Sequence, residues 1–144
     1  MPVKVEHKML CKISKRLLQN ASKFHGHLGL FLVLGVKAGL YANKKMGKDK
    51  LKMHAHIETE PSPPLSCFAD GIQVATGCTM GKRNIELKNG NSLSVKFTKG
   101  DVQLRLEIKP ALLEQFKKIS SLEENKKAAL SIVNMHIEDI FDIT

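Results

Sequence analysis

The apolar stretch LGLFLVLGVKAGLYANKK, residues 28–45, decides how this chain folds. Its apolar residues recur around most of a helical circumference, which is typical of a helix buried in a core. Gly47 follows as a helix stop. Gly35 and Gly39 lie four positions apart, so one face of the helix lacks side chains and another element can approach it closely. We therefore expect a buried central helix with a tightly packed partner.

Two further helices are predicted on either side of this stretch. Apolar residues at helical spacing indicate a helix over residues 5–22, followed by a break over residues 23–26. A short helix is expected over residues 67–76, with Ser66 as its N-cap and Gly77 at its end.

Alternating apolar and polar residues predict strands over residues 53–60, 84–88, 92–98 and 102–108. The last three are joined by Asn89-Gly90 and by residues 99–101, and Asn-Gly between alternating runs is a strong hairpin signal. The expected sheet is therefore mainly antiparallel and contains a β-meander.

The C-terminal part returns to helical patterns. Pro110 opens a short helix, a capping box at Ser121 begins another, and the tail from His136 is ambiguous. The fold class is therefore α+β, with N-terminal helices, a central sheet and C-terminal helices. No internal boundary is visible, so we expect a single domain over residues 1–144.

Composition limits the classes of function. With 144 residues, 42% apolar and 26% charged, the chain suits one folded domain rather than a disordered protein. Its longest apolar run is far shorter than a membrane span, and its N-terminus lacks a signal-peptide pattern, so we expect a cytoplasmic protein. The net charge of +9 comes mostly from scattered lysines, while arginine is scarce and tryptophan absent. Nucleic-acid binding is therefore not expected.

Two histidines and two cysteines are the strongest candidates for a chemical role. His25 and His27 are two positions apart, so both face one ion only where the chain is extended or looped. Cys67 is expected at the start of a helix, where the helix dipole lowers the pKa of a thiol, and Cys78 follows that helix. Three cysteines cannot form a disulfide framework, which leaves free thiols, buried residues or metal ligands open.

Other polar residues could take part in the same site. Asp70 lies three positions after Cys67 and therefore on the same helix face. His54 and His56 share one face of a predicted strand, and they either line the site or face solvent. A catalytic pair of Cys67 with a histidine is also open. The glycine-rich loop over residues 77–84 does not match a phosphate-binding loop.

Two blocks of the sequence form a longer pattern. The first is Phe24-His-Gly-His-Leu28 together with residues 34–39, and the second is CFADGIQVATGCTMGKRNI, residues 67–85. Both resemble the E-subunit family of formylmethanofuran dehydrogenase. The resemblance implies an α+β fold, a homodimer, methanogenesis-related formylmethanofuran dehydrogenase components as partners, and a transition-metal site, usually zinc. The ligands that it implies are His25, His27, Cys67 and Cys78, in a pocket also lined by Asp70, Gln73, Thr79 and Lys82.

The chain departs from this family pattern at Gly29, where many members follow His-Gly-His-Leu with a cysteine. It also resembles a short form without the cysteine-rich zinc-ribbon module of longer members. The resemblance implies a metal-binding accessory or regulatory protein. Two alternatives stay open: a stand-alone metalloenzyme that uses the metal as a Lewis acid, and a carrier of a metal or tetrapyrrole.

Overall fold

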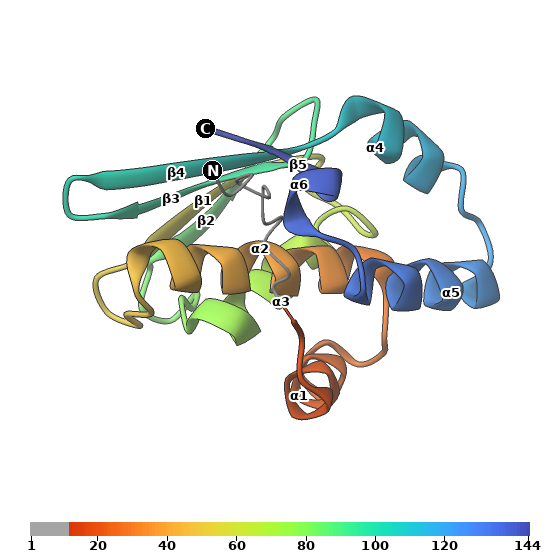
Figure 1. The fold of residues 1–144 in the computed structure, drawn as a ribbon, viewed down its shortest axis with the longest axis horizontal. Helices are drawn as coiled ribbons and strands as arrows, with labels where there is room; N and C mark the ends of the chain where they lie inside the picture. The colour runs from red at the N-terminus through yellow and green to blue at the C-terminus, as the bar shows by residue number, and fades with distance from the viewer. Residues whose placement is uncertain (1–11) are drawn as a thin grey trace, which may run out of the picture.

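Residues 12–144 are described by a computed structural model of the chain (Figure 1). The helices in this range are α1 (Lys15–His25), α2 (Leu30–Met46), α3 (Cys67–Thr76), α4 (Pro110–Lys117), α5 (Leu122–Val133) and α6 (Ile137–Ile140). The strands are β1 (His54–Glu58), β2 (Ile85–Lys88), β3 (Ser94–Lys99), β4 (Val102–Ile108) and β5 (Phe141–Ile143). The ambiguous tail thus forms a short helix and an edge strand.

The strands form one sheet in the order β2-β1-β3-β4-β5. β1 and β2 run parallel, and the other neighbouring pairs run antiparallel. In Figure 1 the sheet lies above α2 and α3, and α1 lies below them. The expected α+β fold, with a mainly antiparallel sheet between N-terminal and C-terminal helices, is confirmed.

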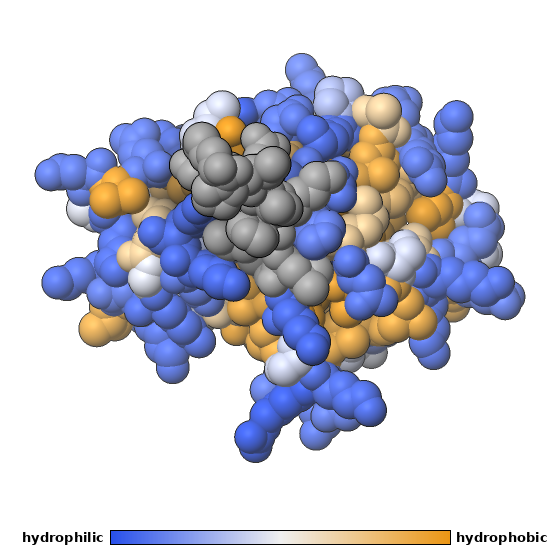
Figure 2. Space-filling model, viewed as in Figure 1, coloured by the Kyte–Doolittle hydropathy of each residue, from blue (hydrophilic) through white to orange (hydrophobic). Residues whose placement is uncertain are grey.

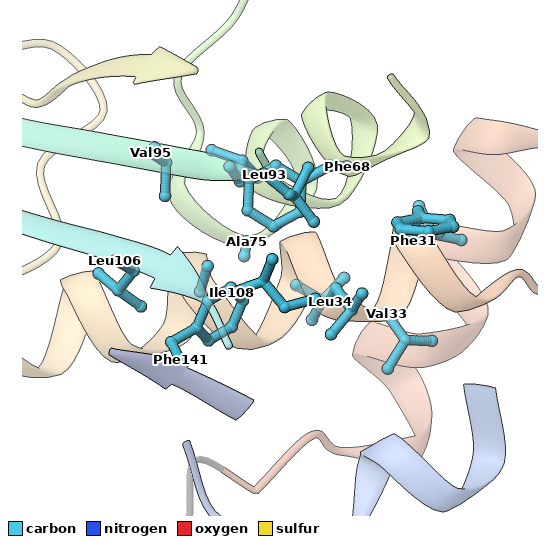
Figure 3. Packing of buried hydrophobic residues seen from close by; sticks show 14 of the residues in the cluster. Phe31, Val33, Leu34, Phe68, Ala75, Leu93, Val95, Leu106, Ile108 and Phe141 are labelled. Carbon is cyan, nitrogen blue, oxygen red and sulfur yellow. The ribbon is translucent and has the colours of Figure 1, made fainter. Parts of the chain in front are cut away.

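One face of the sheet forms one side of the hydrophobic core. Ala55 and Ile57 of β1 and Val95 and Phe97 of β3 are buried, whereas the residues between them face away from the helices. Figure 3 shows Val95 pointing from its strand into the core, and Leu34 of α2 and Phe68 of α3 belong to the same buried cluster. Within residues 12–144, no helix is long and apolar enough to cross a membrane.

The partner of the central helix is α3, and the two backbones touch. A Cβ atom on Gly35 would lie 2.1 Å from the carbonyl oxygen of Phe68, and one on Gly71 would lie 2.1 Å from that of Leu32. Neither position has room for a side chain, so glycine is required on both helices. The close approach predicted at Gly35 and Gly39 is confirmed, since Gly39 faces the C-terminal half of α3.

The hairpin predicted at Asn89-Gly90 is wrong, and so is the β-meander expected from it. β1 lies between β2 and β3, so β2 pairs in parallel with β1 and does not pair with β3. The N–H of Gly90 donates to the carbonyl oxygen of Thr59 and extends the β1–β2 pairing. The second hairpin, over residues 99–101, is confirmed by the antiparallel β3–β4 pair.

The N-terminal helix ends later than predicted, and residues 12–14 of the predicted range are not helical. The N–H of Leu17 donates to Ser14 Oγ, which caps the start of α1, while residues 5–11 of the predicted helix lie outside the described range. Gly26 has a φ of 112° and ends the helix in a left-handed turn. His25 is therefore the last helical residue rather than part of an extended break.

Replacing Gly71 with alanine should lower the free energy of unfolding by about 3 kcal/mol, because the new methyl group would overlap the backbone of α2. Urea denaturation measures this change. Gly81→Ala is the matched control, since a Cβ there meets nothing within 4 Å, and it should shift stability by less than about 0.5 kcal/mol. Equal stability of the two variants would contradict the close helix contact.

Candidate functional site

The end of α1 and the first turn of α3 meet in a hydrogen-bonded pair. Nδ1 of His25 lies 2.6 Å from Oδ2 of Asp70. A carboxylate only accepts, so Nδ1 carries the proton and Nε2 of the neutral ring keeps a free electron pair. Gln73 Nε2 donates to the other carboxylate oxygen at 3.3 Å. The Asp70 carboxylate is thus held from two sides and fixes the orientation of the His25 ring.

His25, His27 and Cys67 line one cavity of about 220 Å³. The left-handed turn at Gly26 brings the two imidazole rings to 4.9 Å between centroids. Nitrogen and sulfur donors of this kind suit zinc and related transition metals. Most of the remaining wall is apolar, from Leu30, Phe31, Leu32, Pro63, Pro64 and Leu122.

The nitrogen and sulfur donors line the same cavity, but they are not placed around a common position where an ion could bind. Across residues 12–144, no three His, Cys, Asp or Glu side chains stand close enough together to hold a metal ion as they are placed. His25 is fixed by Asp70, whereas the side chain of His27 is exposed to solvent. Rotation of His27 is therefore the movement that would bring a second imidazole toward an ion.

The pKa of the Cys67 thiol is raised, which is opposite to the sequence expectation. Partial burial is the main cause, and the negative charge of Asp70 adds to it. The expected N-cap is also wrong, because Ser66 has a helical backbone conformation and its side chain forms no capping hydrogen bond. Without a metal or another cation beside it, Cys67 stays a neutral thiol over a wider pH range than free cysteine.

Cys78 lies at the opposite end of α3. This helix has 10 residues, which span roughly 15 Å at the usual rise. The side chain of Cys78 is fully buried, and its thiol donates to the carbonyl oxygen of Met53 at 3.3 Å. The structure therefore does not bring Cys78 to Cys67, and its place in the expected ligand set is corrected: it packs the core where α3 meets β1.

Thr79 and Lys82 also lie at that far end. Lys82 Nζ donates to the carbonyl oxygen of Gly77 at 2.6 Å and to Thr79 Oγ1 at 3.1 Å. The Thr79 N–H donates to Asn84 Oδ1. These contacts hold the loop after α3 in shape. Gln73 contacts groups at both ends of α3. Its Nε2 donates to Asp70, and its Oε1 accepts the N–H of Met80.

His54 and His56 lie on the outer face of the sheet, away from the helices. Their rings stack with 6.3 Å between centroids, and His56 Nδ1 lies 2.6 Å from Glu86 Oε1. The hydrogen bond from His56, followed by the charge of Lys88, lowers the pKa of Glu86. Of the two sequence interpretations, the solvent-facing one therefore applies, and neither ring lines the His25 cavity.

Nothing in the sequence indicates that Asn125 belongs to this site. It lies in α5 and lines the same cavity as His25. Its Oδ1 accepts the N–H of Leu30, the first residue of α2, at 2.7 Å. The two residues are 95 positions apart, so no local pattern could pair them. The start of the central helix is thus capped by a side chain from the C-terminal part of the chain.

The fold and the site together define an α+β domain with a cavity, lined by imidazole and thiol groups, where α1, α2 and α3 meet. The chain belongs to the FmdE family, described as molybdenum formylmethanofuran dehydrogenase operon, whose family model matches residues 24–143. The resemblance found in the two sequence blocks is thereby confirmed.

A protein of Archaeoglobus fulgidus named "Probable S-adenosyl-L-methionine-binding protein" is 38% identical to this chain over 77 residues. The match covers 49% of this chain and 20% of that protein. The chain thus spans only about a fifth of the curated relative that it matches. That name describes the longer protein as a whole.

The raised pKa of Cys67 gives a test in metal-free protein. Alkylation by iodoacetamide needs the thiolate, so its half-maximal rate should fall at a pH above that of free cysteine. Asp70→Asn removes the nearby negative charge and should move the profile of Cys67 to lower pH, without abolishing the effect of burial. Mass spectrometry of the Cys67 peptide follows the reaction, with Cys67→Ser as the control. A profile that does not move in Asp70→Asn would contradict the assigned influence of Asp70.

Proposed function

We propose that this chain is a metal-binding accessory protein that holds a transition metal, zinc, with His25, His27 and Cys67. The hydrogen bond of 2.6 Å between His25 Nδ1 and Asp70 supports this proposal most directly. Histidines that bind metals commonly donate their second ring N–H to a carboxylate, which fixes the tautomer and makes the other nitrogen a better ligand. Here that other nitrogen belongs to a ring that lines a cavity with a second imidazole and a thiol.

The donor chemistry fits zinc, and ligation requires the donor side chains to move. Ligation needs donor atoms about 2.0–2.3 Å from the ion, which the present side-chain positions within residues 12–144 do not provide. His27 is exposed and can turn without displacing the core. The positive charge of a bound metal would stabilise the Cys67 thiolate and so offset the burial that raises the pKa of this thiol.

A bound zinc with three protein ligands would supply a Lewis acid with one open position. The residues described around this cavity offer few groups that could catalyse a reaction at such a metal. Asp70 already accepts hydrogen bonds from both His25 and Gln73, so it is poorly placed to take a proton from a substrate. This arrangement favours a binding or regulatory role over a stand-alone metalloenzyme.

Two partners are part of the same proposal. The family's operon name leads us to propose formylmethanofuran dehydrogenase components as one partner, and a second copy of this chain as another. Sedimentation velocity at micromolar concentration tests the homodimer, and a single monomeric mass would contradict it.

Protein loaded with zinc and dialysed should retain about one metal ion per chain, measured by elemental analysis. His27→Ala and Cys67→Ser should lose it, because each removes a donor. Asp70→Asn should keep the donors but bind zinc roughly 10- to 100-fold more weakly in a chelator competition, because the His25 ring loses its orienting partner.

Cys78→Ala is the matched control for Cys67→Ser, since Cys78 lies at the far end of α3. It should lose stability but retain zinc at the wild-type stoichiometry. Retention of zinc by both His27→Ala and Cys67→Ser, or its loss in folded Cys78→Ala, would overturn the ligand assignment.

A further inference from the structure

Three loops meet at the end of the molecule opposite the proposed metal site, since α2 and α3 both begin beside that site and end here. The loops comprise residues 44–53, 77–84 and 99–102. Asn84 Nδ2 donates to the carbonyl oxygen of Lys50 at 2.9 Å and joins the first two. Lys99 Nζ donates to the carbonyl oxygens of Met46 and Gly47 and joins the third to the first. Figure 1 shows the β3–β4 turn and the loop after α2 together at its left end, and we call this region the three-loop end.

The three-loop end has a large excess of positive charge. Its eight basic residues are Lys44, Lys45, Lys48, Lys50, Lys52, Lys82, Arg83 and Lys99, and its two acidic residues are Asp49 and Asp101. None of the eight forms an ion pair with an acidic side chain of residues 12–144. Lys82 and Lys99 donate to backbone carbonyl groups, which leaves their charge in place. This end of the molecule therefore attracts anionic surfaces.

Each of the three loops also exposes one large apolar side chain. Leu51 is 75% exposed, Met80 is 68% exposed and Val102 is 54% exposed. Figure 2 shows the same left end of the molecule as mainly hydrophilic, with small separate hydrophobic patches. A partner that covers this end must therefore accept three separate apolar contacts among many positive charges.

Local hydrogen bonds fix the turn that exposes Leu51. Asp49 Oδ1 accepts the N–H of Leu51 at 3.0 Å and that of Lys52 at 2.9 Å, as in an Asx turn. The N–H of Met53 donates to the carbonyl oxygen of Asp49, and the Met53 side chain is fully buried. Because the turn is already ordered, binding through Leu51 costs little conformational entropy.

The composition of this end distinguishes between anionic partners. Protein interfaces are depleted in lysine and enriched in arginine and aromatic residues, whereas the three-loop end has seven lysines, Arg83 and no aromatic residue. Nucleic acid is bound through charge, arginine forks and aromatic stacking, and exposed aliphatic side chains gain little from it. A second copy of this chain would bring like charges together. A bilayer surface with anionic lipids offers both negative headgroups and an apolar layer beneath them.

We propose that the three-loop end docks on the surface of a membrane that contains anionic phospholipids. The basic side chains contact headgroup phosphates, and Leu51, Met80 and Val102 enter the boundary between the headgroups and the acyl chains. The contact is peripheral and uses only loop residues. It leaves the proposed metal site facing away from the bilayer, because that site lies at the opposite ends of α2 and α3.

Cosedimentation with lipid vesicles measures this docking. At low ionic strength the full-length protein should bind vesicles of phosphatidylcholine mixed with phosphatidylglycerol, and added salt should weaken the binding. Vesicles of phosphatidylcholine alone should not bind it, because they lack the negative surface charge. Failure to bind the mixed vesicles would overturn the inference.

Two double variants test whether the charge of this end is responsible. The first combines Lys48→Gln with Lys52→Gln and should weaken binding to the mixed vesicles at least about fivefold, because each lysine near an anionic surface adds to the affinity. The control combines Lys118→Gln with Lys126→Gln, two exposed lysines of the C-terminal part, and should bind within about twofold of the wild type. Equal losses in the two double variants would show attraction to the whole protein and would overturn docking by this end.

Leu51→Asn tests the apolar contribution. It should weaken binding to the mixed vesicles roughly threefold or more, because the apolar side chain no longer enters the bilayer boundary. Leu130→Asn, which changes an exposed leucine of α5, is the matched control and should bind like the wild type. Both side chains are exposed, so the melting temperatures should stay close to that of the wild type.

Duplex DNA is the competing partner in the same measurements. Binding to DNA that is tighter than binding to the mixed vesicles, together with vesicle binding that Leu51→Asn leaves unchanged, would assign the three-loop end to nucleic acid and overturn the inference. Binding to the mixed vesicles that falls in both the lysine variant and Leu51→Asn, and in neither control, supports it.

Discussion

The contact between the backbones of α2 and α3 is the constraint on which the rest of the structure depends. Gly35 and Gly71 face the opposite helix so closely that neither could carry a methyl group. This contact sets the depth at which α3 lies against the central helix. Because Cys67 and Asp70 lie in the first turn of α3, the same contact places Cys67 in the cavity wall next to α2 and Asp70 within reach of His25.

The features that followed from sequence are those encoded locally. The apolar pattern of the central helix and the spacing of Gly35 and Gly39 predicted a buried helix with a close partner. The N–H of Glu124 donates to Ser121 Oγ, as a capping box requires. These signals succeed because the interactions concerned lie within a turn or two of the chain.

The predictions that failed depend on long-range order. Asn89-Gly90 has the composition of a hairpin turn, but β1 occupies the position next to β2 that β3 would need. Helix position suggested an acidic thiol at Cys67, whereas burial and Asp70 act in the opposite direction. Asn125 could not be found at all, because its partner Leu30 is 95 positions away. Tertiary packing decides these cases, and no local pattern records it.

The local geometry at Gly29 bears on the metal proposal. The family resemblance would place a cysteine there, and a Cβ at this position would lie 3.1 Å from Cε1 of His27 and 3.8 Å from Asn125 Nδ2. A thiol would therefore fill the wall of the cavity between the imidazole and the amide donor. The backbone of Gly29 is extended, with φ of −135°, so any residue is tolerated conformationally. The fold thus does not require glycine at position 29, and the missing side chain leaves space between His27 and Asn125. In the proposed metal site, one thiolate fewer would leave a position open. The absence of a side chain at Gly29 therefore favours an exchangeable external ligand over a closed structural metal site.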